Sequence, residues 1–192
     1  MARTKGFDPD IALKAAVEVF CRLGYEHASM ETLMREMGIS KQSLYDTFGD
    51  KRSIYFRAMG HYRETANAGY REIFSTEPTV KGGFAKLFQS IIAENKEQHQ
   101  RGCLLLSANL SSAIDDAEVK HFLHENQREV ESIFRAAFVQ AKKRGELGPA
   151  KDPAALSKFF VATIQGMRAL ARLNHNRQEL RHIASVALAA IE

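Results

Sequence analysis

Residues 41–47 hold five side chains whose chemistry suits contact with nucleic acid: Lys41, Gln42, Ser43, Tyr45 and Thr47. A Gln amide can pair with the edge of an adenine, while cationic and hydroxyl groups can donate hydrogen bonds to phosphate oxygens. Leu44 and Phe48 fall between these polar residues at helical spacing. A short helix here would bury the two apolar side chains and present the polar ones to a DNA groove.

Such a helix must be held by a second one and by a tight corner between them. Ser29 is placed to cap the preceding helix, and Ser40 is placed to cap the helix over 41–48. Gly38 permits the left-handed backbone that the corner requires. The spacing predicts a helix-turn-helix in which residues 41–48 form the recognition helix.

Further pieces of sequence around this unit fit the same pattern: Gly24-Tyr25, Leu44-Tyr45-x-x-Phe48 and Asp50-Lys51. With them, about the first 60 residues resemble the TetR family of bacterial transcriptional regulators. The resemblance implies an all-α fold of about nine helices. Residues 1–54 would form an N-terminal three-helix helix-turn-helix DNA-binding domain, and residues 55–192 a C-terminal helical ligand-binding and dimerisation domain.

The resemblance also assigns roles to individual side chains. Gln42 stands where the family often has glycine, and Thr47 where it often has histidine or another phosphate-binding residue. Gln42 and Lys41 are expected to read bases. Contacts to the DNA backbone are expected from a further set of side chains: Ser29, Thr32, Tyr45 and Lys51.

Composition places the chain among globular proteins, with 45% hydrophobic and 26% charged residues. It lacks an apolar run near the ~20 residues of a membrane span, and its start lacks a secretory signal, so we expect a cytoplasmic protein. Residues 1–60 hold nine Lys and Arg against eight Asp and Glu. DNA binding would therefore depend on where cations lie, including Arg3 and Lys5 on an N-terminal arm.

Apolar residues recur at helical spacing along the chain, and no strand pattern competes with them. Asp8-Pro9 and Asp152-Pro153 are helix start signals, because proline at the first helical position needs no N–H partner. Residues 75–83 have turn chemistry throughout and predict the clearest break. The expected helices beyond the helix-turn-helix are 8–23, 50–74, 84–92, 115–144, 154–173 and 177–191, with a polar segment over 95–102 and a short apolar one over 103–110.

The last two expected helices carry more apolar surface than one chain's core needs. Large apolar surface left in water usually marks an interface, so we expect a homodimer built on a two-fold four-helix contact. An ordinary core helix pair is the alternative. The residues assigned to the dimer interface are Phe159, Phe160, Ile164, Met167, Leu170, Leu180, Ile183, Ala184, Ala187, Leu188 and Ile191.

A small-molecule effector is expected to meet an apolar, aromatic wall in the C-terminal half. For each aromatic residue, ordinary core packing is the competing interpretation. No cofactor is expected, and no spacing of ligands argues for a metal site, since His121 and His124 have no third partner. The candidate pocket residues are Phe84, Phe88, Ile92, Cys103, Phe122, Phe134, Phe138 and Met167.

Cys103 follows Arg101-Gly102 and stands near the start of an expected helix. A neighbouring cation and a helix N-terminus both favour the thiolate, which is the reactive form. TetR-like repressors that respond to electrophiles or oxidants contain a similar Gly-Cys-Leu segment, and so do relatives without thiol chemistry. Cys103 is therefore either a sensor or a packing residue. Two cysteines, Cys21 and Cys103, are too few for a disulfide scaffold.

The function predicted from these observations is that of a ligand-responsive regulator, foremost a repressor that binds palindromic double-stranded operator DNA as a dimer. An activator with the same DNA-binding domain, or a helical carrier that has lost DNA binding, are the alternatives. The sequence lacks a nucleophile with its base and orienting group, a Gly-rich elbow and a cofactor fingerprint. An enzyme is therefore not expected.

Overall fold

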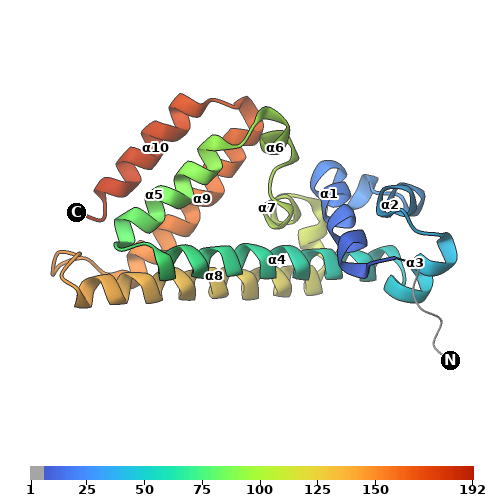
Figure 1. Cartoon of the computed structure of the whole chain (residues 1–192), viewed down its shortest axis with the longest axis horizontal. Coiled ribbons are helices and arrows are strands. Elements are labelled where there is room, and N and C mark those ends of the chain that lie inside the picture. Colours follow the sequence, from blue (N-terminus) through green and yellow to red (C-terminus); the bar gives the residue numbers. More distant parts are fainter. Residues whose placement is uncertain (1–6) are drawn as a thin grey trace. The chain divides into compact units, whose positions relative to one another are not determined.

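The computed structural model describes residues 7–192, and the regular structure in that range is helical (Figure 1). The expected all-α fold is confirmed, while Arg3 and Lys5 lie outside the described residues. Within the described range, every helix is too short or too polar to span a bilayer. In chain order the helices are α1 (Pro9–His27), α2 (Met30–Met37), α3 (Lys41–Phe48), α4 (Lys51–Thr76), α5 (Val80–Ala93), α6 (Lys96–Arg101), α7 (Leu104–Asn109), the 3₁₀-helix η1 (Ser112–Asp115), α8 (Ala117–Lys143), α9 (Pro153–Asn174) and α10 (Arg177–Ala189).

Both Asp-Pro signals are confirmed as helix starts. Asp8 Oδ1 accepts a hydrogen bond from the backbone amide of Asp10 at 2.9 Å, and Asp152 Oδ1 accepts one from the amide of Ala154 at 3.0 Å. Each satisfies an amide that the first helical turn leaves without a partner. Gly24, with φ of 71°, interrupts the helical backbone inside α1 near the expected end of the first helix.

The break between α4 and α5 is much shorter than the sequence predicted. Residues 75–83 were expected to form a turn, but only 77–79 separate the two helices, and Thr79 caps α5. Gly83 is required here for packing, because a Cβ at this position would lie 2.7 Å from the ring of Phe74. Gly83 thus lets α4 and α5 approach each other closely.

Two short helices lie in the stretches between the longer expected ones. The polar stretch over 95–102 contains α6, whose start is held by a capping box between Asn95 and Gln98. The apolar stretch over 103–110 contains α7. Short helices of this kind lack the repeated apolar spacing by which longer ones are recognised.

The chain divides into two compact units. In the first unit, α7 packs on α1, and Arg52 at the start of α4 pairs with Asp116 just before α8, at 2.9 Å between Nη2 and Oδ2. The boundary expected after residue 54, between a DNA-binding and a ligand-binding domain, stays a prediction. Among the described residues, the first unit comprises 7–64 and 103–120, and the second comprises 65–102 and 121–192.

The core of the second unit is a cluster of phenylalanine rings. Phe84 lies at its centre, with ring centroids 5.1 Å from Phe134, 4.9 Å from Phe138 and 4.1 Å from Phe160. All four residues are fully buried. Removing each such ring from water contributes ~1.5–3 kcal/mol, and tilted or edge-on pairs add somewhat more. This cluster joins α5, α8 and α9.

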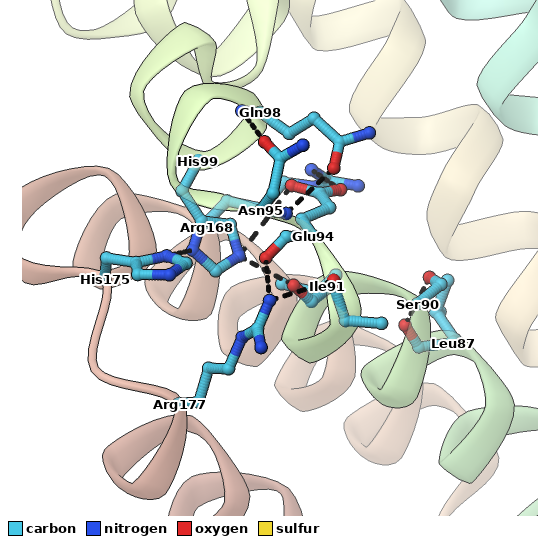
Figure 2. A network of polar contacts seen from close by, with 11 residues as sticks. Leu87, Ser90, Ile91, Glu94, Asn95, Gln98, His99, Arg168, His175 and Arg177 are labelled. Atoms are coloured by element: carbon cyan, nitrogen blue, oxygen red, sulfur yellow. Dashed lines mark hydrogen bonds and ion pairs between the residues drawn. The ribbon is translucent and has the colours of Figure 1, made fainter.

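A polar network lies where α6 meets the turn between α9 and α10 (Figure 2). Buried His99 donates from Nε2 to the carbonyl of Ile91 at 2.7 Å, and its Nδ1 lies 2.5 Å from Nδ1 of His175. Because the carbonyl can only accept, neutral His99 carries its proton on Nε2 and accepts from His175 at Nδ1. His175 has φ of 49° and ends α9 in the left-handed conformation.

Charged side chains surround this histidine pair (Figure 2). Arg168 donates to the carboxylate of Glu94 at 3.3 Å, and Arg177 donates to the backbone carbonyl of Glu94 at 2.9 Å, which closes the end of α5. The pKa of His175 is lowered, first by desolvation and then by the neighbouring His99, Arg177 and Lys96. The network therefore favours neutral histidine at the α9–α10 turn.

Candidate nucleic-acid interface

The helix-turn-helix is formed by α2 and α3, with the caps that the sequence predicted. Ser29 Oγ accepts from the amide of Thr32 at 3.0 Å, and Ser40 Oγ accepts from the amide of Ser43 at 3.2 Å. Gly38 turns the corner with φ of 67°, and its N–H bonds back to α2. Both helices therefore begin and end at residues with a clear physical reason.

The inward faces of these helices are anchored in the first unit. Leu33 of α2 and Leu44 and Phe48 of α3 are buried, as expected. In the same unit, Phe20 of α1 packs edge-on against Tyr55 of α4, with 4.9 Å between ring centroids. This apolar base fixes which face of α3 is presented to solvent.

The outward face of α3 is polar and open. Lys41 and Gln42 are exposed, and Tyr45 is 46% exposed, so all three can reach a DNA groove. Ser43 and Thr47 are half-buried, and the Ser43 hydroxyl accepts a hydrogen bond from Ser40 at 3.0 Å. The structure thus places the five predicted side chains on one short helix, with three of them more accessible than the other two.

Two residues of this region were missed by the sequence reasoning. Asp46 is exposed on α3, where its carboxylate could accept from a cytosine amino group. Arg57 of α4 donates to the carbonyl of Thr47 at 2.8 Å, and its guanidinium lies 5.6 Å from the ring of Phe48. Arg57 therefore closes the C-terminal end of the recognition helix, where a cation is favoured.

Lys51 has partners within its own chain. Its Nζ donates to the carbonyl of Glu26 at 3.2 Å and lies 4.5 Å from the centroid of the Tyr25 ring. An ammonium group has three donors, so hydrogen bonds remain for a phosphate. The predicted phosphate contact of Lys51 remains a prediction.

The start of α2 offers two further polar groups. The hydroxyls of Ser29 and Thr32 lie 2.9 Å apart, at the end of the helix where amides favour an anion. Between α3 and α4, Asp50 accepts from the amide of Ser53 at 2.8 Å, and the hydrogen bonds from Ser53 lower the pKa of Asp50. The start of α4 is therefore held by an ionised cap.

Two family models match this chain. One, described as bacterial regulatory proteins of the tetR family, matches residues 12–58. The other, described as a tetracyclin repressor-like C-terminal domain, matches residues 84–187, which is more than half of the chain. The chain belongs to the TetR family. TetR-family proteins are DNA-binding transcriptional regulators rather than enzymes, so the predicted class of function is confirmed.

Similar proteins of known name agree with this assignment. The chain is 28% identical to the uncharacterized HTH-type transcriptional regulator YezE of Bacillus subtilis, over the full length of both chains. It is 27% identical to the HTH-type transcriptional repressor ComR of Escherichia coli, over 97% of this chain and 90% of ComR. A cysteine mutant of the TetR family regulator CifR, solved with a 26-base-pair operator DNA, matches at 29% identity and a TM-score of 0.87, covering 99% of this chain and all of CifR.

Six of the eight predicted pocket residues of this TetR-family chain are buried in the core of the second unit. Phe122 and Cys103 are half-buried, and Cys103 belongs to the first compact unit, whereas the others belong to the second. Two hollows described in the second unit, of about 470 and 420 Å³, are lined by other residues. The effector role of the predicted set stays a prediction. Its buried members are Phe84, Phe88, Ile92, Phe134, Phe138 and Met167.

The predicted dimer surface is covered in part by its own chain, and its role as an interface stays a prediction. The sequence argument expected part of this surface to stay in water unless a second subunit covered it, but most of the assigned side chains are buried within their own chain, because α9 and α10 pack against α5 and α6. Of the predicted set, Phe159 is exposed, and Leu170, Ile183 and Leu188 are partly buried. The members buried within their own chain are Phe160, Ile164, Met167, Leu180, Ala184, Ala187 and Ile191.

A different stripe of α9 remains open. Phe159 is 43% exposed and Leu173 is 79% exposed. Small residues join them at alternating spacings of four and three, so the stripe runs along one face of the helix. Its exposed members are Ala155, Phe159, Ala162, Gly166, Ala169 and Leu173.

Proposed function

We propose that this TetR-family protein is a repressor that binds a palindromic operator as a homodimer and is released by a small-molecule effector. The observation that carries the proposal is the exposed polar face of α3, held on a capped and apolar base. Similarity to the repressor ComR, and to CifR solved on operator DNA, supports it.

The DNA contacts divide into base readers and backbone contacts. Gln42 and Lys41, both exposed on the first turn of α3, are proposed to read base edges in the major groove. The remaining polar groups are proposed to hold the DNA backbone and fix the register of α3. They are Ser29, Thr32, Ser43, Tyr45, Thr47 and Lys51.

Dimerisation is proposed to use the open stripe of α9. A two-fold contact through Phe159 and Leu173, with small residues between them, would allow two helices to approach closely. Two copies of α3 could then enter successive major grooves about one helical turn apart. The stripe, rather than the buried residues of the original prediction, is therefore the proposed interface.

An effector can release DNA only by binding one state of the dimer more tightly than the other. To move the protein from 1% to 99% released, it must favour the released state ~10⁴-fold. The aromatic second unit is the proposed place for that differential binding, because its residues offer the apolar area that a small molecule would bury.

Cys103 is the proposed chemical route to release. It stands at the start of α7, which packs on α1, and Ser112 just beyond α7 bonds to Glu26 of α1 at 3.1 Å. A thiolate that added to an electrophile would gain a bulky carbon substituent at this contact. The support is that the cysteine-bearing segment belongs to the same compact unit as the DNA-binding helices.

The electrophile response is tested with N-ethylmaleimide and the variant Cys103→Ser. Both proteins should bind operator DNA, and only the wild-type protein should release it after treatment, as measured by fluorescence anisotropy. Cys21→Ser is the matched control, because Cys21 is buried and should not alter the response. Equal release from the wild-type and Cys103→Ser proteins would end this part of the proposal.

The DNA-binding proposal is tested by selecting genomic fragments on the purified protein and sequencing what is retained. A palindromic site should be enriched, and the enrichment should be lost with Tyr45→Ala. Leu110→Ala is a suitable control, since Leu110 is 72% exposed in the first unit but lies outside α2 and α3. No enrichment at moderate salt would instead favour a helical carrier that does not bind DNA.

A further inference from the structure

Asn67 on α4 is a buried polar side chain without a hydrogen-bond partner. It is 1% exposed, and neither Nδ2 nor Oδ1 has a partner among the described residues. The other two buried polar side chains among the described residues have hydrogen-bond partners. His99 bonds to the carbonyl of Ile91, and Ser157 donates to the carbonyl of Ala154 at 2.9 Å. Because an unpaired buried amide opposes folding, its presence calls for a functional explanation.

The position of Asn67 connects it to the aromatic core of the second unit. Tyr70 follows Asn67 by three positions and Phe74 follows it by seven, so the three residues share one face of α4. The Tyr70 ring lies 5.4 Å from that of Phe134, and the Phe74 ring lies 4.8 Å from that of Phe84. The amide of Asn67 therefore stands on the same helix face as the side chains that pack on the phenylalanine cluster.

The helix around Asn67 lacks bulky apolar side chains. The run Ala66-Asn67-Ala68-Gly69 separates the aromatic residues that follow from the charged stretch before it. Asn67 is the one buried residue of α4 within the second unit. At this turn, α4 thus contributes an amide where the next two turns contribute aromatic rings.

The buried residues of the second unit indicate what the amide would recognise. The buried residues of the second unit are apolar apart from Asn67, His99 and Ser157, and none carries a permanent charge. An Asn side chain offers one acceptor and one donor group side by side. A complementary molecule would be uncharged and largely apolar, with a donor and an acceptor on one group.

We propose that Asn67 anchors the effector, and that the effector is an uncharged, largely apolar molecule bearing a carboxamide-like donor–acceptor group. This inference rests on the ligand response in the proposed function and adds the chemical class of the ligand. The bound group supplies both partners that the amide lacks in the free protein. Ligand binding is then favoured by relief of an unpaired buried group as well as by burial of apolar area.

The competing explanation is that Asn67 serves the fold through a bound water. Asn67→Leu separates the two, because leucine has the same branching and number of side-chain heavy atoms without the polar groups. Removal of an unpaired amide should raise Tm by about 3–6 °C, whereas loss of a water-bonded amide should lower it. Ser157→Ala is the control: its hydroxyl has a partner, so this substitution should not raise Tm.

The ligand class is tested with benzamide, using acetophenone and benzoate as probes of similar shape. Acetophenone can only accept a hydrogen bond, and benzoate is charged. For the wild-type protein, thermal shifts should rank benzamide above acetophenone, with no shift from benzoate. In Asn67→Leu the affinity for benzamide should fall roughly three- to tenfold, while that for acetophenone should fall less.

Two results would overturn the proposal: a lower Tm for Asn67→Leu, or benzamide shifts equal in the wild-type protein and the variant. Operator binding, measured in parallel by anisotropy, keeps this proposal separate from the proposed function. If the wild-type protein and Asn67→Leu both fail to bind DNA while the thermal shifts behave as expected, the repressor function is contradicted and the ligand site is supported. If DNA binding is intact and the shifts are equal, the ligand site fails alone.

Discussion

Gln42 is the side chain of α3 whose substitution should have the most specific effect. It is exposed on the first turn, and its amide can make a paired hydrogen bond with adenine. Gln42→Ala should lose about 1–3 kcal/mol of discrimination at one operator base pair and little elsewhere. Titration of operators carrying each base at each position measures this. Equal losses on specific and scrambled DNA would assign Gln42 to the backbone instead.

Lys51 should have a different signature. Lys51→Ala is expected to weaken specific and scrambled DNA about equally and to reduce the salt slope by about one, as loss of a phosphate contact does. Because Lys51→Ala also removes the contacts with Glu26 and Tyr25, the variant should have a lower Tm than the wild-type protein. Anisotropy at several salt concentrations and thermal unfolding separate these effects. A lower Tm with an unchanged salt slope would leave Lys51 with a purely structural role.

At the residue scale, hydrogen bonds between near neighbours in the sequence were predictable, and those between distant residues were not. The caps at Ser29 and Ser40 involve amides three residues away, so sequence spacing alone reveals them. The partners of Lys51 and Arg57 lie 25 and 10 residues away and include backbone carbonyls, which any residue could supply. The sequence therefore identified the open face of α3 and missed the residue that closes its end.

At the scale of elements, the α9–α10 turn should be sensitive to acid. His175 has a lowered pKa, so the unfolded chain binds its proton more readily than the folded one. Its contribution to stability should therefore be intact above the ordinary pKa of about 6.5 and decline as pH falls below it. His175→Asn removes the titrating ring and keeps a residue that tolerates the left-handed conformation.

Thermal unfolding of the wild-type protein and His175→Asn between pH 8 and pH 5 measures this contribution. The wild-type protein should lose more Tm over the acidic part of the range than the variant. His182→Asn is the matched control, because His182 is exposed on α10. Parallel curves for the wild-type protein and His175→Asn would show that the pair does not control acid sensitivity.

Element limits were predicted well where caps and prolines mark them, as at Asp8 and Asp152. They were predicted poorly where composition suggested a turn and packing decided otherwise. The glycine at 83 favours a turn locally, but in the structure it admits the ring of Phe74 and lies inside α5. The burial of α9 and α10 residues depends likewise on which helices pack there, and a single apolar face cannot distinguish its own core from a partner subunit.

At the scale of the whole molecule, the dimer proposal predicts the effect of one charge. Phe159→Glu places a carboxylate in the open stripe of α9 and should convert the dimer to a monomer, because an unpaired charge at an apolar interface is costly. Leu110→Glu adds the same charge to an exposed apolar site in the first unit and should remain dimeric. Sedimentation velocity gives the mass of each. A dimeric Phe159→Glu protein would remove the stripe from the interface.

The first compact unit is built from two separate stretches of chain. Its DNA-binding helices come from the N-terminal stretch, but α7, η1 and Asp116, which pairs with Arg52, come from residues 103–120. A single crossover between relatives that exchanged only the N-terminal DNA-binding helices would therefore leave them without their own 103–120 segment. The new helices would pack against a segment from the other parent. Chimaeras, in the laboratory or by recombination, should function best when both stretches are inherited from the same parent.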